Sequence, residues 1–256
     1  MTTSKVGEIR VMKCGEECEI VEYKNSRDIT IKFMKTEEKI RSNYNHFKKG
    51  TIKSHFSPSI CGIGIVGGIR VEDECGELVN YYKIWYSMIN RCYAKKSLQK
   101  RPTYKECTVC DEWIYYKNFK EWYEKNYYEI EGEKMCLDKD ILVKGNKIYS
   151  PETCVFVPSN INTLFTKSDA KRGEYPIGVS WKKKNNKYQA NCRIFDIKNN
   201  KYRYKYLGLY NTPEEAFKVY KKAKEENIKQ VADYYKDQIP QKLYEAMYKY
   251  EVEITD

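Results

Sequence analysis

Histidine is scarce in this sequence of 256 residues, and long apolar runs are absent. Without a run of about 18 apolar residues, no transmembrane helix is expected. The first ten residues, MTTSKVGEIR, also lack the apolar stretch of a signal peptide. The only histidines, His46 and His55, have no partner at helical spacing, so we expect them on the surface or in loops rather than as metal ligands. The ten cysteines are scattered, which favours reduced thiols and a cytoplasmic location.

Charge is concentrated in one part of the chain. The whole sequence carries a net charge of +11, and the segment Lys171–Lys229 alone has 16 Lys and Arg against 6 Asp and Glu, a net of +10. Abundant Lys, Asn, Ile and Tyr indicate an AT-rich coding sequence, which accounts for part of this charge without any function. The composition, 41% hydrophobic and 32% charged, predicts a soluble α+β protein of two or three small domains.

Three strands are predicted within this basic segment. The first covers residues 177–183, and Asn185 and Asn186 supply a hairpin turn, because asparagine tolerates left-handed backbone conformations. The second strand, residues 187–197, alternates apolar with polar and basic side chains, and the third, from Lys201, alternates tyrosines with Lys and Arg. Each strand therefore has one apolar and one cationic side.

A helix is predicted to follow the strands and to cover one side of the sheet. Thr212 can cap it, Pro213 suits its first position, and Glu215 completes a capping box. Its apolar stripe, with Ala216 and Tyr220, is expected to pack on the tyrosine side of the sheet. The side with Lys, Arg, Gln and Asn would then stay open.

An open basic sheet face suits the major groove of DNA. There Lys and Arg hold phosphates, while Arg, Asn and Gln pair with base edges. The alternative is a solvated, lysine-rich surface without a partner. Amide side chains and Trp181 accompany the charge, so the nucleic-acid interpretation is favoured.

The segments GVSW, KYQANCRI and YLGLYNTPEEAFKVYKKA resemble the APETALA-like DNA-binding domain of plant ethylene-response factors and its phage and homing-endonuclease relatives. The resemblance covers about 50 residues and implies a sheet that reads the major groove. The family's contacts would fall on Trp181, Lys183, Gln189, Arg193, Arg203 and Lys205. A register shift of one residue would move any of them to the other face. Plant members carry more arginine in the sheet, so lysine here favours looser sequence specificity.

The N-terminal part reads as β-structure followed by a glycine-rich linker. In residues 1–60, short period-two segments such as Ile29 to Phe33 are separated by turn residues, which predicts a small β-barrel-like domain. Residues 61–79 begin with CGIGIVGG, which contains G-x-G-x-x-G. An extended segment rather than a helix follows, so a dinucleotide site is disfavoured and a linker is predicted.

The middle domain is predicted over residues 80–168. A helix from Asn80 would bury the residues at helical spacing, which are Trp85, Met88, Ile89 and Cys92. A short strand at residues 108–109 leads into a second helix with an aromatic core face. Residues 135–165 then read as strand, loop, strand and helix, a compact ββα unit.

This ββα unit, the pattern W-x-x-M-x-x-R-C-Y from Trp85 and the P-x-Y from Pro102 are together similar to phage-encoded HNH-type endonucleases, many of which also carry the ethylene-response-type domain. The resemblance spans about 85 residues and implies one divalent metal and a histidine, following an aspartate, that activates water for phosphodiester cleavage. Asp138 matches the aspartate, but Lys139 stands where the histidine does, and Thr153 replaces an asparagine of many members. A protonated lysine is a poor base and no metal ligand, so the domain is a degenerate HNH-like one.

Two interpretations of the ββα unit stay open. If cleavage is retained, the candidate catalytic residues are Asp138, Lys139 and Asn146. Mg²⁺ would then bind through hard oxygen donors, principally Asp138, Asp140 and Asn162, with Asn146 and Asn160 as further candidates. Otherwise the unit serves as a scaffold or DNA clamp.

Zinc is a separate and disfavoured cofactor prediction. Cys107 and Cys110 form a C-x-x-C pair, and Cys136 and Cys154 flank the hairpin. The second pair is 18 residues apart, whereas zinc sites usually use two close pairs.

The sequence thus predicts an N-terminal β domain (1–60), a linker (61–79), an HNH-like domain (80–168), a DNA-binding domain (171–226) and C-terminal helices (227–256). The expected function is that of a phage-type, sequence-tolerant binder of double-stranded DNA from the HNH endonuclease family, acting in the host cytosol, with metal-dependent nicking as an open question. The alternative is a catalytically inactive DNA-binding regulator or an inhibitor of a host nucleic-acid enzyme. RNA and a host protein stay alternative partners, and no membrane partner is expected.

Overall fold

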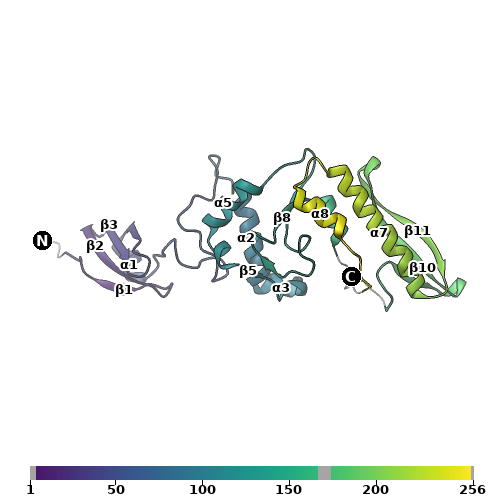
Figure 1. The fold of residues 1–256 in the computed structure, drawn as a ribbon. Coiled ribbons are helices and arrows are strands. Elements are labelled where there is room, and N and C mark those ends of the chain that lie inside the picture. The colour runs from purple at the N-terminus through teal and green to yellow at the C-terminus, as the bar shows by residue number, and fades with distance from the viewer. Residues whose placement is uncertain (1–3, 167–173, 255–256) are drawn as a thin grey trace. The chain divides into compact units, whose positions relative to one another are not determined.

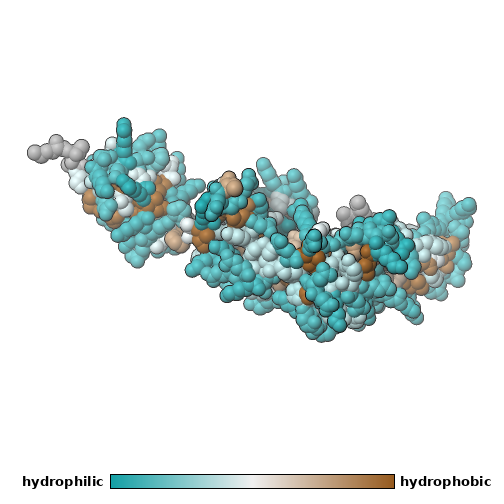
Figure 2. All heavy atoms as spheres, turned by 90° about the horizontal axis from the view of Figure 1, so that it is seen from above, coloured by the Kyte–Doolittle hydropathy of each residue, from teal (hydrophilic) through white to brown (hydrophobic). Residues whose placement is uncertain are grey.

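The computed structural model describes residues 4–166 and 174–254, so the predicted boundaries at 168 and 171 lie outside the described residues. The protein is a mixed helix-and-sheet protein of the α+β class with two compact units, Met1–Lys125 with Ile148–Ser150, and Asn126–Lys147 with Pro151–Asp256. The boundary between the units falls inside the predicted HNH-like domain. Most of the visible surface is hydrophilic (Figure 2). No helix in the described ranges is long and apolar enough to cross a membrane.

The first unit begins with strands and continues with helices (Figure 1). Its strands are β1 (Ile9–Val11), β2 (Glu17–Asn25), β3 (Asp28–Phe33), β4 (Lys39–Ser42), β5 (Thr108–Val109) and β7 (Ile148–Tyr149). Its helices are α1 (Tyr44–Lys49), α2 (Asn80–Tyr93), α3 (Lys95–Lys100), the 3-10 turn η1 (Pro102–Tyr104), α4 (Asp111–Ile114) and α5 (Tyr116–Asn126).

The N-terminal β-structure is an open sheet, so the prediction of a barrel-like domain is wrong. Strands β1 to β4 pair in sequence order and antiparallel, and no pairing in the described residues joins β1 to β4. One sheet face buries Ile20, Ile31 and Phe33 against Phe47 of α1. Helix α1 was not predicted. Asn43 caps it by accepting a hydrogen bond from the His46 backbone, and Gly50 ends it in the left-handed conformation.

The helical part of the first unit follows the predicted pattern. Helix α2 buries Trp85, Met88, Ile89 and Cys92, as the helical spacing predicted. Within the predicted linker, the Ile65 backbone donates to the Ile114 carbonyl at 2.9 Å and accepts from Tyr116 at 2.9 Å. A Cβ at Gly64 would lie 2.9 Å from the Trp85 ring. The start of the glycine-rich segment is therefore anchored against the helices.

The second unit contains the ββα unit, a three-stranded sheet and the C-terminal helices. Its strands are β6 (Met135–Asp138), β8 (Val155–Pro158), β9 (Val179–Lys182), β10 (Lys187–Asp196) and β11 (Lys201–Tyr210). Its helices are α6 (Ser159–Phe165), the 3-10 turns η3 (Lys183–Asn185) and η4 (Ile197–Asn199), α7 (Pro213–Tyr235) and α8 (Gln241–Lys249). The predicted strand-loop-strand-helix order of the ββα unit and the three strands followed by a helix are both confirmed.

One hydrophobic core joins the ββα unit to the C-terminal helices. Val157 of β8 and Ile161 of α6 belong to the same buried cluster as Val231 of α7 and Leu243 and Met247 of α8. The apolar side of α8 thus packs within this unit. Because α7 reaches both this core and the sheet, it couples the ββα unit to the sheet.

The three-stranded sheet has the order β11-β10-β9, and α7 runs along it (Figure 1). The predicted capping box at the start of α7 is confirmed, since Thr212 accepts from the Glu215 backbone at 3.2 Å. Asn186 and Asn200 close the two hairpins in the left-handed conformation, at φ 50° and 46°. Gly178 precedes β9 at φ 77°, with the Tyr220 ring of α7 against it.

Candidate nucleic-acid interface

The register of the sheet decides which side chains share a face. Strands β10 and β11 pair Arg193 with Tyr204 and Asn191 with Tyr206. Directly paired residues in an antiparallel sheet project to the same side. Strand β9 pairs Ser180 with Gln189 and Lys182 with Lys187. We call this side the open face and define it by Ser180, Lys182, Lys187, Gln189, Asn191, Arg193, Tyr204 and Tyr206.

The opposite side of the sheet is covered by α7. Ala190 and Cys192 of β10 are fully buried there, and Cys192 shares a core with Tyr220 of α7. Cys192 pairs with Lys205, and Ile194 pairs with Arg203. Lys205 and Arg203 therefore lie on the helix side, where they stay exposed because β11 is the edge strand.

The expected packing of Tyr204 and Tyr206 under the helix is therefore wrong. Tyr204 is 80% exposed and Tyr206 60% exposed. The four-residue connection from Ile197 to Asn200 makes odd positions of β10 face even positions of β11. The prediction of alternating sides within β10 and within β11 was correct. The register assumed between these two strands was off by one residue, which placed the alternate side chains of β11 on the wrong side of the sheet.

The structure brings together only part of the predicted DNA-binding set. Gln189 and Arg193 lie on the open face, and the Gln189 amide donates to Asn191 Oδ1 at 2.9 Å. Trp181 pairs with Tyr188, at 4.8 Å between ring centroids, on the helix side. Lys183 lies in η3, beyond the end of β9.

The other predicted contacts, Arg203 and Lys205, lie on the wrong side for a contact through the open face. The predicted contact set left out six residues of this face, which are Ser180, Lys182, Lys187, Asn191, Tyr204 and Tyr206, although Lys187 and Asn191 were expected on the polar side of their strand. The length of the second hairpin turn was the signal that could have found them, because it fixes the register.

The open face is cationic. Lys182, Lys187 and Arg193 lie on it, and none of its defining residues is acidic. The Arg193 guanidinium lies 4.4 Å from the centre of the Tyr202 ring, which orients it at the surface. The acid of strand β10, Asp196, is engaged on the helix side, because Arg203 Nε lies 3.3 Å from Asp196 Oδ2. The Asn199 hydrogen bond and, further, Arg203 lower the pKa of Asp196.

Hydrogen bonds within the loop between the two strands of the ββα unit hold this loop in one conformation. Lys139, only 8% exposed, donates through Nζ to Asp140 Oδ2 and to the Asn146 carbonyl, both at 2.9 Å. The Asn146 amide returns a hydrogen bond to the Lys139 carbonyl at 2.7 Å. Asp138 Oδ1 accepts from the backbone nitrogens of Asp140 and Ile141 at 2.8 Å each. The predicted catalytic residues are thus adjacent, but Lys139 acts as a cross-link of the loop.

The carboxyl group of Asp138 is held in an unfavourable environment for its charge. Burial, and then the neighbouring charge of Asp140, raise the pKa of Asp138 to about 6. Asp138 therefore carries a proton over part of the weakly acidic range in the folded protein.

Most of the oxygen donors predicted for Mg²⁺ have other partners in this structure. The Asp140 carboxylate is paired with the Lys139 ammonium, which opposes a cation at the same position. The Asn160 amide donates to Glu133 at 2.9 Å, and Asn162 lies on α6. No group of three or more His, Cys, Asp or Glu that could hold a metal ion occurs among residues 4–166 and 174–254. Magnesium binding stays a prediction.

The four cysteines of the zinc prediction belong to different units. Cys107 and Cys110 lie in the first unit, at the ends of β5, and Cys136 and Cys154 lie in the second. Zinc binding also stays a prediction.

No known protein family, curated protein or solved structure matches this chain. Its function is therefore inferred from the residues and their arrangement.

Proposed function

We propose that this protein binds double-stranded DNA through the open face, with little sequence preference. One observation carries the proposal: the register gathers Lys182, Lys187 and Arg193 with the amides of Gln189 and Asn191 on one side of the sheet, opposite the side on which Cys192 packs against Tyr220 of α7. The open face ends at Arg193 and Tyr204, because Phe195 and Tyr202 on the same side pack into the core of the ββα unit and the later part of α7. A two- or three-stranded ribbon fits the major groove of DNA. The surrounding segment supplies almost all of the net positive charge of the chain.

The side chains of the open face suit a duplex. Lys182, Lys187 and Arg193 can neutralise phosphates, which supplies most of the affinity of non-specific binding. Gln189 and Asn191 can pair with base edges, and the exposed rings of Tyr204 and Tyr206 offer apolar contact. Arg193 is the one arginine among the residues that define the open face. Lysine cannot form the bidentate pair that arginine forms with guanine, so the discrimination between DNA sequences is weak.

The ββα unit supports the sheet in this proposal and does not cut DNA. Lys139 stands where hydrolysis would need a general base, and its ammonium is already committed to Asp140 and to the Asn146 carbonyl. The same unit is joined to the sheet, because the Tyr202 hydroxyl donates to the Asn160 carbonyl of α6. This arrangement fits the DNA-binding regulator better than the nuclease.

Binding is tested with a labelled duplex and a pair of matched charge reversals. Arg193→Glu acts on the open face, whereas Arg203→Glu acts on the helix side of the same sheet. We expect Arg193→Glu to weaken binding at least about tenfold at 0.1 M salt and to reduce the salt slope by about one. Arg203→Glu should change the affinity by less than about threefold. Equal effects of the two reversals would show that the open face is not the interface.

Cleavage is tested on supercoiled plasmid with Mg²⁺ or Mn²⁺. We expect the mobility shift without nicking. Nicking that Asp138→Ala abolishes would establish the nuclease instead. A duplex RNA of the same sequence serves as competitor, and tighter binding to RNA than to DNA would change the assigned partner.

A further inference from the structure

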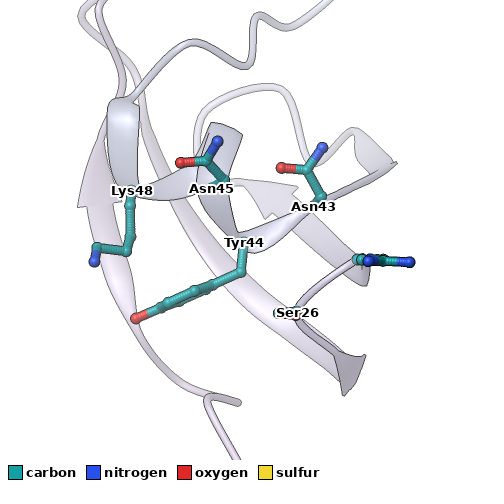
Figure 3. Close-up of a pocket in the computed structure, with 6 residues that line it drawn as sticks. Ser26, Asn43, Tyr44, Asn45 and Lys48 are labelled. Carbon is teal, nitrogen blue, oxygen red and sulfur yellow. The ribbon is translucent and has the colours of Figure 1, made fainter.

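The N-terminal sheet and α1 line a polar, cationic hollow, which is separate in sequence from the open face. It is an open depression of about 650 Å³ lined by Ser26, Arg27, Asn43, Tyr44, Asn45 and Lys48. This volume is within the range of small-ligand sites. Figure 3 shows Lys48 and Tyr44 extending toward the same side of the hollow. We call it the N-terminal hollow.

Two short segments build this hollow, and the backbone fixes them together. Ser26 and Arg27 form the tip of the β2–β3 hairpin, and the other four residues come from α1 and its N-cap, Asn43. The Tyr44 backbone nitrogen donates to the Ser26 carbonyl at 2.9 Å. The Asn25 side chain accepts from the Arg27 backbone at 2.9 Å. The lining residues are thus held in place before any ligand arrives.

The cations of the hollow lack acidic partners within the described part of the chain. No ion pair there joins Arg27 or Lys48 to a carboxylate, and both side chains are exposed. Two acids of the same sheet have other partners: Asp28 binds Arg41 at 2.6 Å, and Glu8, which keeps its charge, accepts from the Tyr44 hydroxyl at 3.0 Å. The hollow therefore presents two positive charges, Arg27 on the hairpin tip and Lys48 on α1.

The other lining groups indicate what kind of anion would fit. Asn45 is exposed and offers an amide donor and acceptor, which can pair with the edge of a base. The Tyr44 ring is half-buried against Tyr23 and Phe47, and its remaining exposed part adds an aromatic surface, with Lys48 Nζ 6.0 Å and Lys5 Nζ 5.8 Å from its centre. Cations with an aromatic ring and amides are the combination that sequence-tolerant binding of single strands uses, since phosphates meet the cations and bases meet the ring and amides.

We infer that the N-terminal hollow is a second nucleic-acid site that takes a single strand, with phosphates at Arg27 and Lys48. This inference rests on the proposed DNA binding, because it gives the protein two contacts on one polynucleotide. Two linked contacts raise the overall affinity through effective concentration without any new contact at the sheet. Residues 4–57 carry 12 Lys and Arg against 8 Asp and Glu, so the sign of the local charge favours the same partner.

The test uses the full chain and labelled single-stranded DNA. The variant Arg27→Ala/Lys48→Ala removes both cations, and Lys35→Ala/Lys39→Ala removes two exposed lysines from the same domain outside the hollow. Two phosphate contacts correspond to a salt slope of about 1.4 and about 25-fold in affinity between 0.1 M and 1 M salt. We therefore expect the hollow variant to lose about tenfold or more at 0.1 M salt, and the control less than about threefold.

Further measurements distinguish a failure of this inference from a failure of the proposed function. In the Arg193→Glu background, single-strand binding should persist and still depend on Arg27 and Lys48. Duplex binding that is unchanged by Arg193→Glu would contradict the proposed function without contradicting the inference about the N-terminal hollow. Equal single-strand affinity of the hollow variant and its control would overturn the inference itself. If the hollow variant loses binding to a labelled polyglutamate peptide but not to single-stranded DNA, the hollow binds an acidic protein segment, and the inference is also overturned. Unchanged circular dichroism of each variant shows that the fold is kept.

Discussion

Asn227 in α7 provides the sharpest test of how the sheet is held against the helix. Its side chain is 5% exposed and closes two hydrogen bonds with one residue of β10. The Phe195 backbone nitrogen donates to Asn227 Oδ1 at 2.9 Å, and Asn227 Nδ2 donates to the Phe195 carbonyl at 3.1 Å. Strand β9 pairs only with Lys187–Ala190 of β10, so at Phe195 the Asn227 amide stands where a neighbouring strand would be.

The substitution Asn227→Leu keeps the number and branching of the side-chain heavy atoms but removes both hydrogen bonds. Each buried backbone group left without a partner costs about 1–3 kcal/mol, so the free energy of unfolding should fall by about 2–6 kcal/mol. Asn227→Asp keeps the acceptor for the Phe195 nitrogen but buries a charge next to the Phe195 carbonyl, and it should lose at least as much.

Urea unfolding followed by circular dichroism measures the effect. Asn211→Ala, an exposed asparagine in the same unit, serves as control and should change the free energy of unfolding by less than about 0.5 kcal/mol. A loss below about 1 kcal/mol for Asn227→Leu would refute the reasoning, because it would mean that water or a shifted strand satisfies Phe195.

Two further predictions concern a glycine and a carboxyl group of the second unit. Gly178→Ala should destabilise the protein by about 3 kcal/mol or more, because its φ is 77° and a Cβ would lie 2.0 Å from the Tyr220 ring; a thermal midpoint within 2 °C of the parent, roughly what 1 kcal/mol or less produces, would contradict this. Asp138 has a folded pKa of about 6, above its unfolded value near 3.8, so its contribution to stability is present below pH 4 and is lost as the pH rises through 6. Asp138→Asn keeps the acceptor oxygen, so it should remove this pH dependence and raise the stability at pH 7.5 by about 1–3 kcal/mol; an unchanged pH profile in urea titrations would show that Asp138 is not the group responsible.

Local signals in the sequence determined much of the fold. Thr212 and Glu215 fixed the start of α7, since a capping box needs only residues three positions apart. Trp85 and Met88 identified the buried side of α2, because helical spacing alone brings them together. The hairpin asparagines and the strand-loop-strand-helix order of the ββα unit were equally local. The concentration of positive charge near the C-terminus is a property of the sequence alone.

The tertiary structure decided which side of each element is used. The pairing of Arg193 with Tyr204 placed the tyrosines outside and Arg203 beneath the sheet, because alternation within a strand does not fix its phase against the next one. The roles of Lys139 and Asn227 were likewise beyond the sequence, since each depends on partners brought close by folding. The N-terminal hollow exists only because the β2–β3 hairpin tip meets the start of α1. Composition and periodicity describe single segments, whereas a binding surface depends on the contacts between them.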